Sequence, residues 1–320
     1  MDEVRKLLTS MPCQTSPLDV LPCSLLKDCA DGFAPAIARL ANLSMQAGMF
    51  QARFKSAQVL PLLKKAGLNI SSPANHSPIS NLSTVSKALE TLVQARLRPH
   101  LTNLINFSQF RSTYRQGLCT ETALLDVLDN VYTAANEKQV TVPIGLDLSA
   151  AFDTVCHRTL LQRLQSEFGV SGTALSWIRS YLTDRKQFVK LGLRKSHETK
   201  LEVGVPQGSV LGPLLFAVYC SPAADVIASH GIRHHQYADD TQLHLAMRAN
   251  NTAAGLSTLA ACSADVKLWF MQNGLQLNPD KPEALVMGTA NQLRAASSLT
   301  SVKVAGVDLP VADDLSLIHI

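Results

Sequence analysis

Two adjacent carboxylates, Asp239 and Asp240, stand in the stretch RHHQYADDTQLHL between residues whose alternation is typical of β-strands. Because Asp also favours tight turns, this stretch alone is equally compatible with an ordinary hairpin tip. A second acidic site lies upstream in GLDLSAAFDTV, where Asp147 follows an expected strand and Asp153 comes six residues later. Clustered carboxylates repel one another, so such sites normally need exposure, protonation or a cation.

Asp147 can project beyond the end of its strand toward a neighbouring hairpin tip, because side chains alternate across a strand. If the hairpin pairs beside that strand, Asp147, Asp239 and Asp240 converge. Bound divalent cations usually neutralise the repulsion among carboxylates in such a group. Carboxylate and water ligands favour Mg²⁺ or Mn²⁺ over Zn²⁺. Two such ions about 4 Å apart suit in-line phosphoryl transfer, which also needs a nucleotide and a strand end.

The segment VGVPQGSVLGPLLF, residues 203–216, could supply contacts to a nucleotide. Its Gly204, Gly208 and Gly212 permit close approach of the backbone, and Gln207 can hydrogen-bond a base or a sugar. By itself, a Pro-Gln-Gly turn is equally typical of an ordinary loop.

The composition describes a folded chain with reduced thiols. Of the 320 residues, 46% are hydrophobic and 17% charged, which excludes disorder. The formal net charge of +4 tolerates a polyanionic partner without requiring one. Seven cysteines without a CxxC pair, and an N-terminus without an apolar signal segment, predict a nuclear or cytoplasmic protein, not secreted and without disulfides.

The pattern of helices and strands alternates irregularly, which favours an α+β fold over a doubly wound parallel sheet. Residues 209–231 are apolar enough to raise the question of a membrane span, but Pro213, Pro222 and Asp225 interrupt them, so we expect a buried core helix. Ser83 and Thr120 are candidate helix caps. We expect helices within 17–48 and over 83–101, 120–138, 157–182, 209–230 and 253–273, and strands over 58–63, 141–149, 186–205 and around the Asp239–Asp240 hairpin.

Taken in order, these segments resemble the reverse transcriptases of non-LTR retrotransposons, the LINE type, most closely the CR1 and L2 groups. The resemblance covers nearly the whole chain, and eight segments in the family's order exclude coincidence. It rests on SPLDVLP, ARFKSAQVLPLLKKAG, SPISNLSTVSKALE, TETALLDVL, LDLSAAFDTV, GVPQGSVLGPLLF, YADDTQLHL and NGLQLNPDKPEAL.

The resemblance implies a right-hand polymerase fold of fingers and palm, with an antiparallel palm sheet backed by helices. The implied organisation is an N-terminal helical segment over 1–49, fingers over 50–120 and a palm over 121–320, ending before the primer grip and thumb. Asp147, Asp239 and Asp240 then hold two Mg²⁺ or Mn²⁺ ions, and the partners are an RNA template, a DNA primer or target and dNTPs, with no membrane.

The resemblance also assigns residues that contact the nucleotide. Phe152 matches the bulky ring that favours deoxynucleotides, although the same residue type is common in a core. Gln207 and Gly208 match the loop near the incoming nucleotide, and Lys64 and Lys65 match lysines that touch the triphosphate. Lys281 matches a lysine proposed to protonate pyrophosphate, and an exposed lysine is the alternative.

Several positions depart from the family's pattern, among them Leu118, Cys119 and Pro282. Ser77 stands where an arginine would grip the triphosphate, and serine cannot replace that charge. Pro143 precedes Asp147 in the expected strand, where proline is tolerable only at an edge or a strand start. Together with the missing thumb and endonuclease, these changes predict a fragment of a decaying copy.

The leading hypothesis is therefore an RNA-directed DNA polymerase domain that uses two metal ions. A catalytically inactive nucleic-acid-binding relic is the alternative. An unrelated metal-dependent phosphohydrolase would explain the carboxylates but neither the VPQGS segment nor Phe152.

Overall fold

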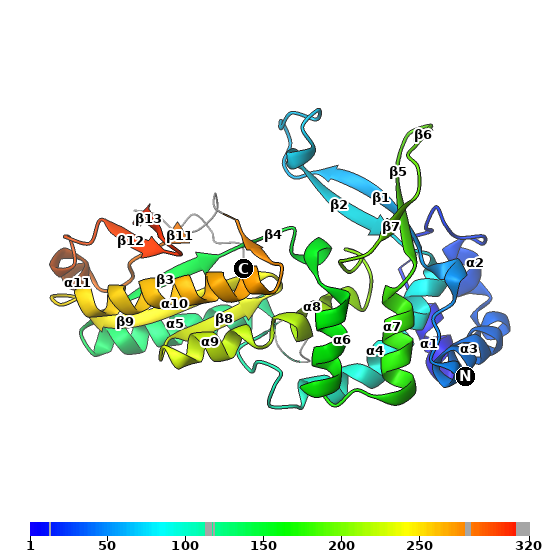
Figure 1. Cartoon of the computed structure of the whole chain (residues 1–320), viewed down its shortest axis with the longest axis horizontal. Coiled ribbons are helices and arrows are strands. Elements are labelled where there is room, and N and C mark those ends of the chain that lie inside the picture. Colours follow the sequence, from blue (N-terminus) through cyan, green and yellow to red (C-terminus); the bar gives the residue numbers. More distant parts are fainter. Residues whose placement is uncertain (13, 113–116, 118, 279–282, 312–320) are drawn as a thin grey trace. The chain divides into compact units, whose positions relative to one another are not determined.

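The computed structural model describes residues 1–12, 14–112, 117, 119–278 and 283–311 (Figure 1). It divides into two compact units, and each unit combines two separate stretches of the chain. The first unit contains residues 1–104 and 152–219, and the second contains residues 105–151 and 220–320. The subdomain boundaries expected from the sequence, 1–49, 50–120 and 121–320, stay predictions, because the compact units follow a different division.

The first unit combines a helical base with a mixed sheet. Its sheet has the order β2-β1-β5-β6, with β7 also paired to β5, and only the β1–β5 pair is parallel. Its elements are α1 (Asp2–Ser10), α2 (Cys23–Asp28), α3 (Ala30–Ala47), β1 (Ser56–Leu63), β2 (His76–Asn81), α4 (Thr84–Thr102), η3 (Ala151–Thr154), α6 (His157–Ser166), α7 (Gly172–Leu182), β5 (Arg185–Leu191), β6 (Arg194–Lys195), β7 (Thr199–Leu201) and α8 (Gly212–Cys220), of which η3 and α8 each have one residue in the second unit.

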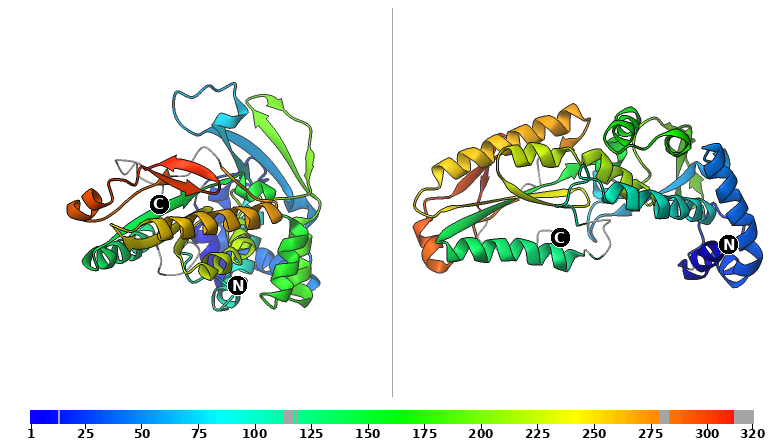
Figure 2. Two further views of the ribbon diagram at one scale, coloured as in Figure 1. Left: turned by 60° about the vertical axis from the view of Figure 1, so that its left-hand side comes forward. Right: turned by 90° about the horizontal axis from the view of Figure 1, so that it is seen from below.

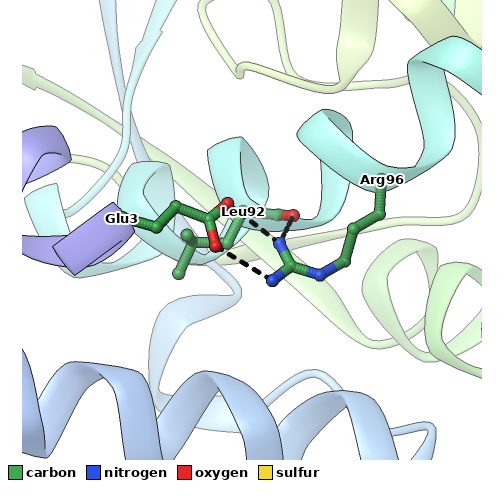
Figure 3. Close-up of polar contacts among 3 residues, drawn as sticks. All are labelled: Glu3, Leu92 and Arg96. Atoms are coloured by element: carbon green, nitrogen blue, oxygen red, sulfur yellow. Dashed lines mark hydrogen bonds and ion pairs between the residues drawn. The ribbon is translucent and has the colours of Figure 1, made fainter. Parts of the chain in front are cut away.

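Helix α4 begins where the sequence predicts, since the Ser83 side chain accepts a hydrogen bond from the Ser86 N–H at 3.1 Å. On its exposed side, the Arg96 guanidinium reaches back to α1 and binds both carboxylate oxygens of Glu3, at 3.1 and 3.0 Å (Figure 3). The same guanidinium donates to the Leu92 carbonyl at 2.7 Å. Both charged side chains are about half exposed, so this pair contributes at most about 1 kcal/mol to stability.

The second unit is built on an antiparallel sheet in the order β11-β3-β9-β8. Helix α5 lies against one face of the sheet, and α9 and α10 lie against the other (Figure 2). This arrangement confirms the predicted antiparallel sheet backed by helices. The elements are α5 (Thr120–Asn136), β3 (Gln139–Leu146), β4 (Leu148–Ser149), α9 (Ala223–Ser229), β8 (Arg233–Tyr237), β9 (Asp240–Arg248), α10 (Ala253–Gln272), β10 (Gln276–Leu277), β11 (Glu283–Ala284), α11 (Ala290–Ala295), β12 (Ser301–Val304) and β13 (Val307–Pro310).

Three expectations about local structure are wrong. The expected single helix over 209–230 is two helices, α8 and α9, because Ser221 and Pro222 separate them. Thr120 is not the cap of α5; the helix begins at Thr120, and the Cys119 N–H donates to the Thr122 hydroxyl at 2.9 Å. Helices α1 and α11 were not expected at all.

Pro143 is also placed differently from the expectation, because it lies in the inner strand β3 and is buried. The strand tolerates it because the outward side of Pro143 faces β11, which has only two residues. The Pro143 carbonyl still accepts a hydrogen bond from the Leu285 N–H at 3.2 Å. Because Pro143 has no N–H, a hydrogen bond is missing on the side of the short strand β11, and the β3–β9 ladder loses none.

The apolar stretch Gly212–Ser229 is long and apolar enough to cross a membrane by length and composition, with 61% of it buried in the structure. The predicted role as buried core is confirmed for α8, where the side chains of Leu214, Leu215, Phe216 and Tyr219 are at most 1% exposed. A core helix passes the same test of length and composition.

Three buried histidines make the sheet of the second unit sensitive to acid. His234, His235 and His244 are less than 9% exposed, and at least one ring nitrogen of each has no hydrogen-bond partner among the described residues. Burial lowers the pKa of His234 and of His244 from 6.5 to about 4, with a further contribution from the neighbouring His235. The pKa of His235 is lowered as well.

We therefore expect the free energy of unfolding to fall as the pH drops from about 6.5 toward 4. In this window the unfolded chain binds protons that the folded sheet excludes, so each of His234 and His244 contributes a slope of roughly 1.4 kcal/mol per pH unit. Above pH 6.5 the stability due to these groups is fully present. Urea unfolding at several pH values measures the slope, which a His234→Leu/His244→Leu variant should flatten and His197→Gln, at an exposed position, should not. An unchanged slope in the double variant would contradict the assignment.

Candidate active site

The strand end of the second unit places two acidic residues next to each other. The β3–β9 ladder ends with Leu146 opposite Thr241, and Asp147 and Asp240 are the next residues at that end. Directly opposed positions in an antiparallel pair share one face of the sheet, as Leu146 and Thr241 do, and the two acidic residues adjoin this last pair. Asp239 lies with Ala238 in the turn of the β8–β9 hairpin, where Tyr237 pairs with Asp240. The predicted hairpin beside the Asp147 strand is thus confirmed.

Asp147 is held by a residue that sequence reasoning missed. The Asn278 side-chain amide donates to Oδ2 of Asp147 at 2.8 Å, and the Asn278 N–H donates to the Asp147 carbonyl at 2.9 Å. This two-point contact continues the short pairing of β4 with β10. The carboxylate is half-buried, and a fixed amide partner limits its rotation.

The donor chemistry at this strand end fits a hard divalent cation in part. Carboxylate and amide oxygens are the ligands that Mg²⁺ and Mn²⁺ prefer, and no thiol or imidazole competes at these positions. However, no three acidic, histidine or cysteine side chains in the described part of the chain form a group that could hold a metal ion. The expected convergence of Asp147, Asp239 and Asp240 is therefore not seen as a formed cluster. Asp239 belongs to the turn and not to the ladder, so its side chain is not aligned by strand register.

A buried arginine supports the turn that carries Asp239. Arg111 is 1% exposed, and its guanidinium donates to the Ala238 carbonyl at 2.7 Å and to Oε1 of Gln236 at 3.1 Å. The adjoining backbone pairs with β8, since the Gln236 N–H donates to the Phe110 carbonyl at 2.9 Å. Ala238 has a left-handed φ of 53°, which is strained for a residue with a Cβ. The guanidinium thus fixes a carbonyl inside a strained turn.

Replacing Arg111 with methionine should lower the free energy of unfolding by roughly 2–3 kcal/mol, because the Ala238 carbonyl and the Gln236 amide lose a charged donor. Denaturant unfolding measures this change. Arg248→Met, at the exposed end of β9, is the matched control and should shift stability by less than about 0.5 kcal/mol. Equal effects of the two variants would show that Arg111 does not hold the turn. No sequence pattern marked Arg111, since its partners lie more than a hundred residues away.

In the first unit, the Gln207–Gly208 loop is tied to strand β2. The Ser80 N–H donates to the Gln207 carbonyl at 2.7 Å. Gly208 has a φ of 105°, and a Cβ there would meet the Ser80 carbonyl oxygen at 2.8 Å. Glycine at this position thus permits close approach to β2, and the half-buried Gln207 side chain sits on a fixed backbone. Close approach to a nucleotide stays a prediction.

Phe152 packs against the same loop region. The centres of the Phe152 and Phe216 rings are 4.9 Å apart. The Phe152 carbonyl accepts a hydrogen bond from the Val205 N–H at 2.8 Å. Gly204 has a φ of 86°, and a Cβ there would meet the Asp153 carbonyl oxygen at 2.8 Å. Phe152, Gln207 and Gly208 thus lie in one connected part of the first unit, and Phe152 is half-buried rather than a fully enclosed core residue.

The predicted triphosphate lysines lie on the hairpin that continues β1. Lys64 and Lys65 are exposed, and the Lys64 N–H donates to the Asn75 carbonyl at 2.9 Å. Ser77 pairs with Leu62 in the adjoining β1–β2 ladder, three residues before Ser80, which binds the Gln207 carbonyl. Lys281 lies outside the described residues. The assignment of these residues to a nucleotide stays a prediction.

A buried carboxylate that sequence reasoning also missed holds the far end of the glycine loop. Glu90 of α4 is fully buried, and its Oε2 accepts from the N–H groups of Val210 and Leu211, at 2.8 and 3.1 Å. The Tyr181 hydroxyl donates to the same oxygen at 3.2 Å, and the Ser86 hydroxyl donates to Oε1 at 3.0 Å. Burial raises the pKa of Glu90, and the neighbouring charge of Arg185 opposes that rise.

Arg185 is the buried cation of this network. It is fully buried, donates to the Tyr181 carbonyl at 3.1 Å, and its guanidinium lies 4.7 Å from the centre of the Tyr181 ring. The Glu90 network thus links α4, α7 and β5 to the residues that lead from the Gln207 loop into α8. Glu90 stands between Leu89 and Thr91 in a helix, and its sequence position resembles an ordinary surface site.

The fold as a whole belongs to the polymerase class. The chain is similar in structure to apo telomerase from Candida tropicalis truncated from its C-terminal domain, with a TM-score of 0.52 at 12% sequence identity. The similarity covers 93% of this chain and 61% of the telomerase chain. At this level of identity, the likeness concerns the fold.

The sequence specifies the family within that class. Residues 63–309 match the family described as reverse transcriptase (RNA-dependent DNA polymerase), so the chain belongs to the reverse transcriptases. It is 29% identical to the probable RNA-directed DNA polymerase from transposon BS and 28% identical to that of the mobile element jockey, both of Drosophila melanogaster. Each match covers 88% of this chain, which spans about a third of the length of these relatives, 31% in both cases. The predicted likeness to LINE-type reverse transcriptases is confirmed.

Proposed function

We propose that this chain extends a DNA primer on an RNA template by adding deoxynucleotides, with two divalent metal ions. The observation that carries the proposal is the placement of Asp147 and Asp240 at one strand end, next to the turn that holds Asp239. In a chain of the reverse transcriptase family, carboxylates at such a strand end have a direct chemical use. The relatives named as RNA-directed DNA polymerases support the same assignment.

Asp147 and Asp240 would hold the metal ions together with Asp239. When bound, divalent cations lower the pKa of the attacking hydroxyl and stabilise the leaving oxygen in phosphoryl transfer. The protein's own part is positional: Asn278 fixes the Asp147 carboxylate, and Arg111 fixes the turn between β8 and β9.

The first unit would supply the contacts to the nucleotide. We assign Lys64 and Lys65 to the triphosphate, because exposed ammonium groups bind phosphate as point charges. We assign Gln207 and Gly208 to the nucleotide and Phe152 to the sugar, where a ring disfavours a 2′-hydroxyl. The connected packing of Phe152 with the Gln207–Gly208 loop supports these roles.

Primer extension on an RNA template, with dNTPs and either Mg²⁺ or Mn²⁺, tests the proposal. Extension that requires the metal and the RNA template is the expected result, and ribonucleotides should be poor substrates. A Ser77→Arg variant runs in parallel, because arginine would restore charge near the triphosphate. Metal-independent extension, or none from either protein while circular dichroism shows an intact fold, would contradict the proposal and favour the inactive relic.

A further inference from the structure

The sheet of the first unit carries an unusual concentration of positive charge on one face. Residues 185–201 contain six of the 29 lysines and arginines of the chain but only one of its 25 acidic residues, Glu198. The excess of positive charge over the whole chain therefore resides in this segment. Arg185 is buried in the Glu90 network, and the other five cations are exposed.

Four of these cations share a face because of strand register. Lys186 is directly opposite Lys200 in the β5–β7 pair, and Lys190 is directly opposite Lys195 in the β5–β6 pair. Opposed residues face the same side, and Lys186 and Lys190 are an even number of residues apart on β5. We call Lys186, Lys190, Lys195 and Lys200 the lysine face; Figure 1 shows β5, β6 and β7, on which they lie.

One extra residue in the chain creates this arrangement. Near the turn, Ser196 is opposite Val189, as the Ser196 N–H donates to the Val189 carbonyl at 2.9 Å. Farther along, Thr199 is opposite Gln187. The chain advances three residues from Ser196 to Thr199, while β5 advances only two from Val189 to Gln187, so the first strand contains a bulge of one residue. Without this bulge, Lys200 would be opposite Arg185, on the other side of the sheet. The bulge therefore moves a lysine onto a face that already carries three.

Like charges directly opposite each other in a sheet are destabilising, and the lysine face has two such pairs. Glu198 offsets part of the repulsion, at 3.8 Å from Lys186 and 3.7 Å from Lys195. Lys195 also lies 4.0 Å above the centre of the Phe188 ring. Neither Lys190 nor Lys200 has a comparable ion pair in the part of the chain that the structure describes, so their charges are accessible to an external anion.

We propose that the lysine face binds the phosphate backbone of a nucleic acid strand without reading its sequence. A row of ammonium groups on an extended ribbon matches a repeating line of phosphates, and lysine binds phosphate as a point charge. Phe188 is only 7% exposed, so the face offers no open ring for stacking on bases. The proposal rests on the proposed function for its choice of partner, since RNA is the expected template.

The test compares binding and stability in two double variants. Lys190→Gln/Lys200→Gln removes one lysine from each opposed pair and leaves both ion pairs of Glu198. Lys6→Gln/Arg39→Gln removes two exposed cations from helices of the same unit and is the matched control. Fluorescence anisotropy with single-stranded RNA, with an RNA–DNA duplex and with heparin, without divalent metal and over a range of salt concentrations, measures affinity. Thermal unfolding without nucleic acid measures stability.

We expect the lysine-face variant to bind both nucleic acids about ten-fold more weakly, with a salt slope reduced by about 1.5. The melting temperature should rise by about 2 °C, because repulsion is relieved. The control should change neither quantity. Each of three results would overturn the proposal. Equal weakening in the control variant would attribute binding to net charge, and tighter binding to heparin than to either nucleic acid would exclude nucleic acid as the partner. A lower melting temperature of the lysine-face variant would show that the lysines have a structural role. Because binding needs no catalysis, a chain that binds but does not extend primers would fail the proposed function alone.

Discussion

Replacing Asp147 with asparagine should reduce primer extension by at least about a thousand-fold while leaving the fold intact. The carboxylate stands at the end of β3, half-buried, and asparagine has nearly the same shape. The side-chain oxygen of asparagine can still accept the 2.8 Å hydrogen bond from Asn278, so the local structure has no reason to change. What the substitution removes is the charge that a metal ion requires, and removing charge stabilisation of the transition state has effects of this size.

Single-turnover extension assays measure this loss, and circular dichroism with thermal unfolding verifies the fold. Asp225→Asn is the control, because Asp225 is an exposed carboxylate on α9 in the same unit, and its loss should change the rate less than two-fold. Asp239→Asn should resemble Asp147→Asn if the turn residue joins the metal site. A normal rate in Asp239→Asn would instead limit the metal ligands to Asp147 and Asp240, which adjoin the end of the β3–β9 ladder.

Replacing Glu90 with alanine should lower the free energy of unfolding by about 3–5 kcal/mol, because several buried hydrogen-bond donors lose their acceptor. The substitution leaves four donors without their acceptor: two backbone N–H groups, the Tyr181 hydroxyl and the Ser86 hydroxyl. It also leaves Arg185 fully buried without its neutralising charge. The same residues anchor the end of the Gln207 loop, so activity at saturating dNTP should decline as well.

Denaturant unfolding measures the effect of Glu90→Ala, and Glu3→Ala is its control. Glu3 also pairs with an arginine, but that pair is about half exposed, so its loss should cost at most about 1 kcal/mol. Glu90→Gln keeps the shape of the side chain and one acceptor oxygen, and it should lie between the two. If Glu90→Ala is no worse than Glu3→Ala, the network does not support the loop.

The stability of these two networks separates an inactive relic from a functional domain. A chain that had lost its function would be expected to lose costly polar networks, since unpaired buried groups are destabilising. Glu90 accepts from the Val210 N–H, Arg185 donates to the Tyr181 carbonyl and Arg111 donates to the Ala238 carbonyl. Ser77, in contrast, replaces an arginine expected from the resemblance. Recovery of activity in Ser77→Arg would therefore identify a local lesion in an otherwise maintained structure.

The sequence by itself determined the acidic residues, the glycine loop and most helices. Asp239 and Asp240 are recognisable as adjacent carboxylates within an extended stretch, and Gly204 and Gly208 because glycine permits close approach of the backbone. These signals are local: they depend on residue type, on period and on backbone sterics, which act within a few residues.

The tertiary structure alone decided which residues support the site. Glu90, Arg111 and Asn278 each have partners more than a hundred residues away, so no periodicity could identify them. The lysine face depends on a single extra residue between Ser196 and Thr199, because strand register decides which side chains share a face. Local propensity cannot set such a register; only the pairing of whole strands fixes where buried charges find partners and where exposed charges gather.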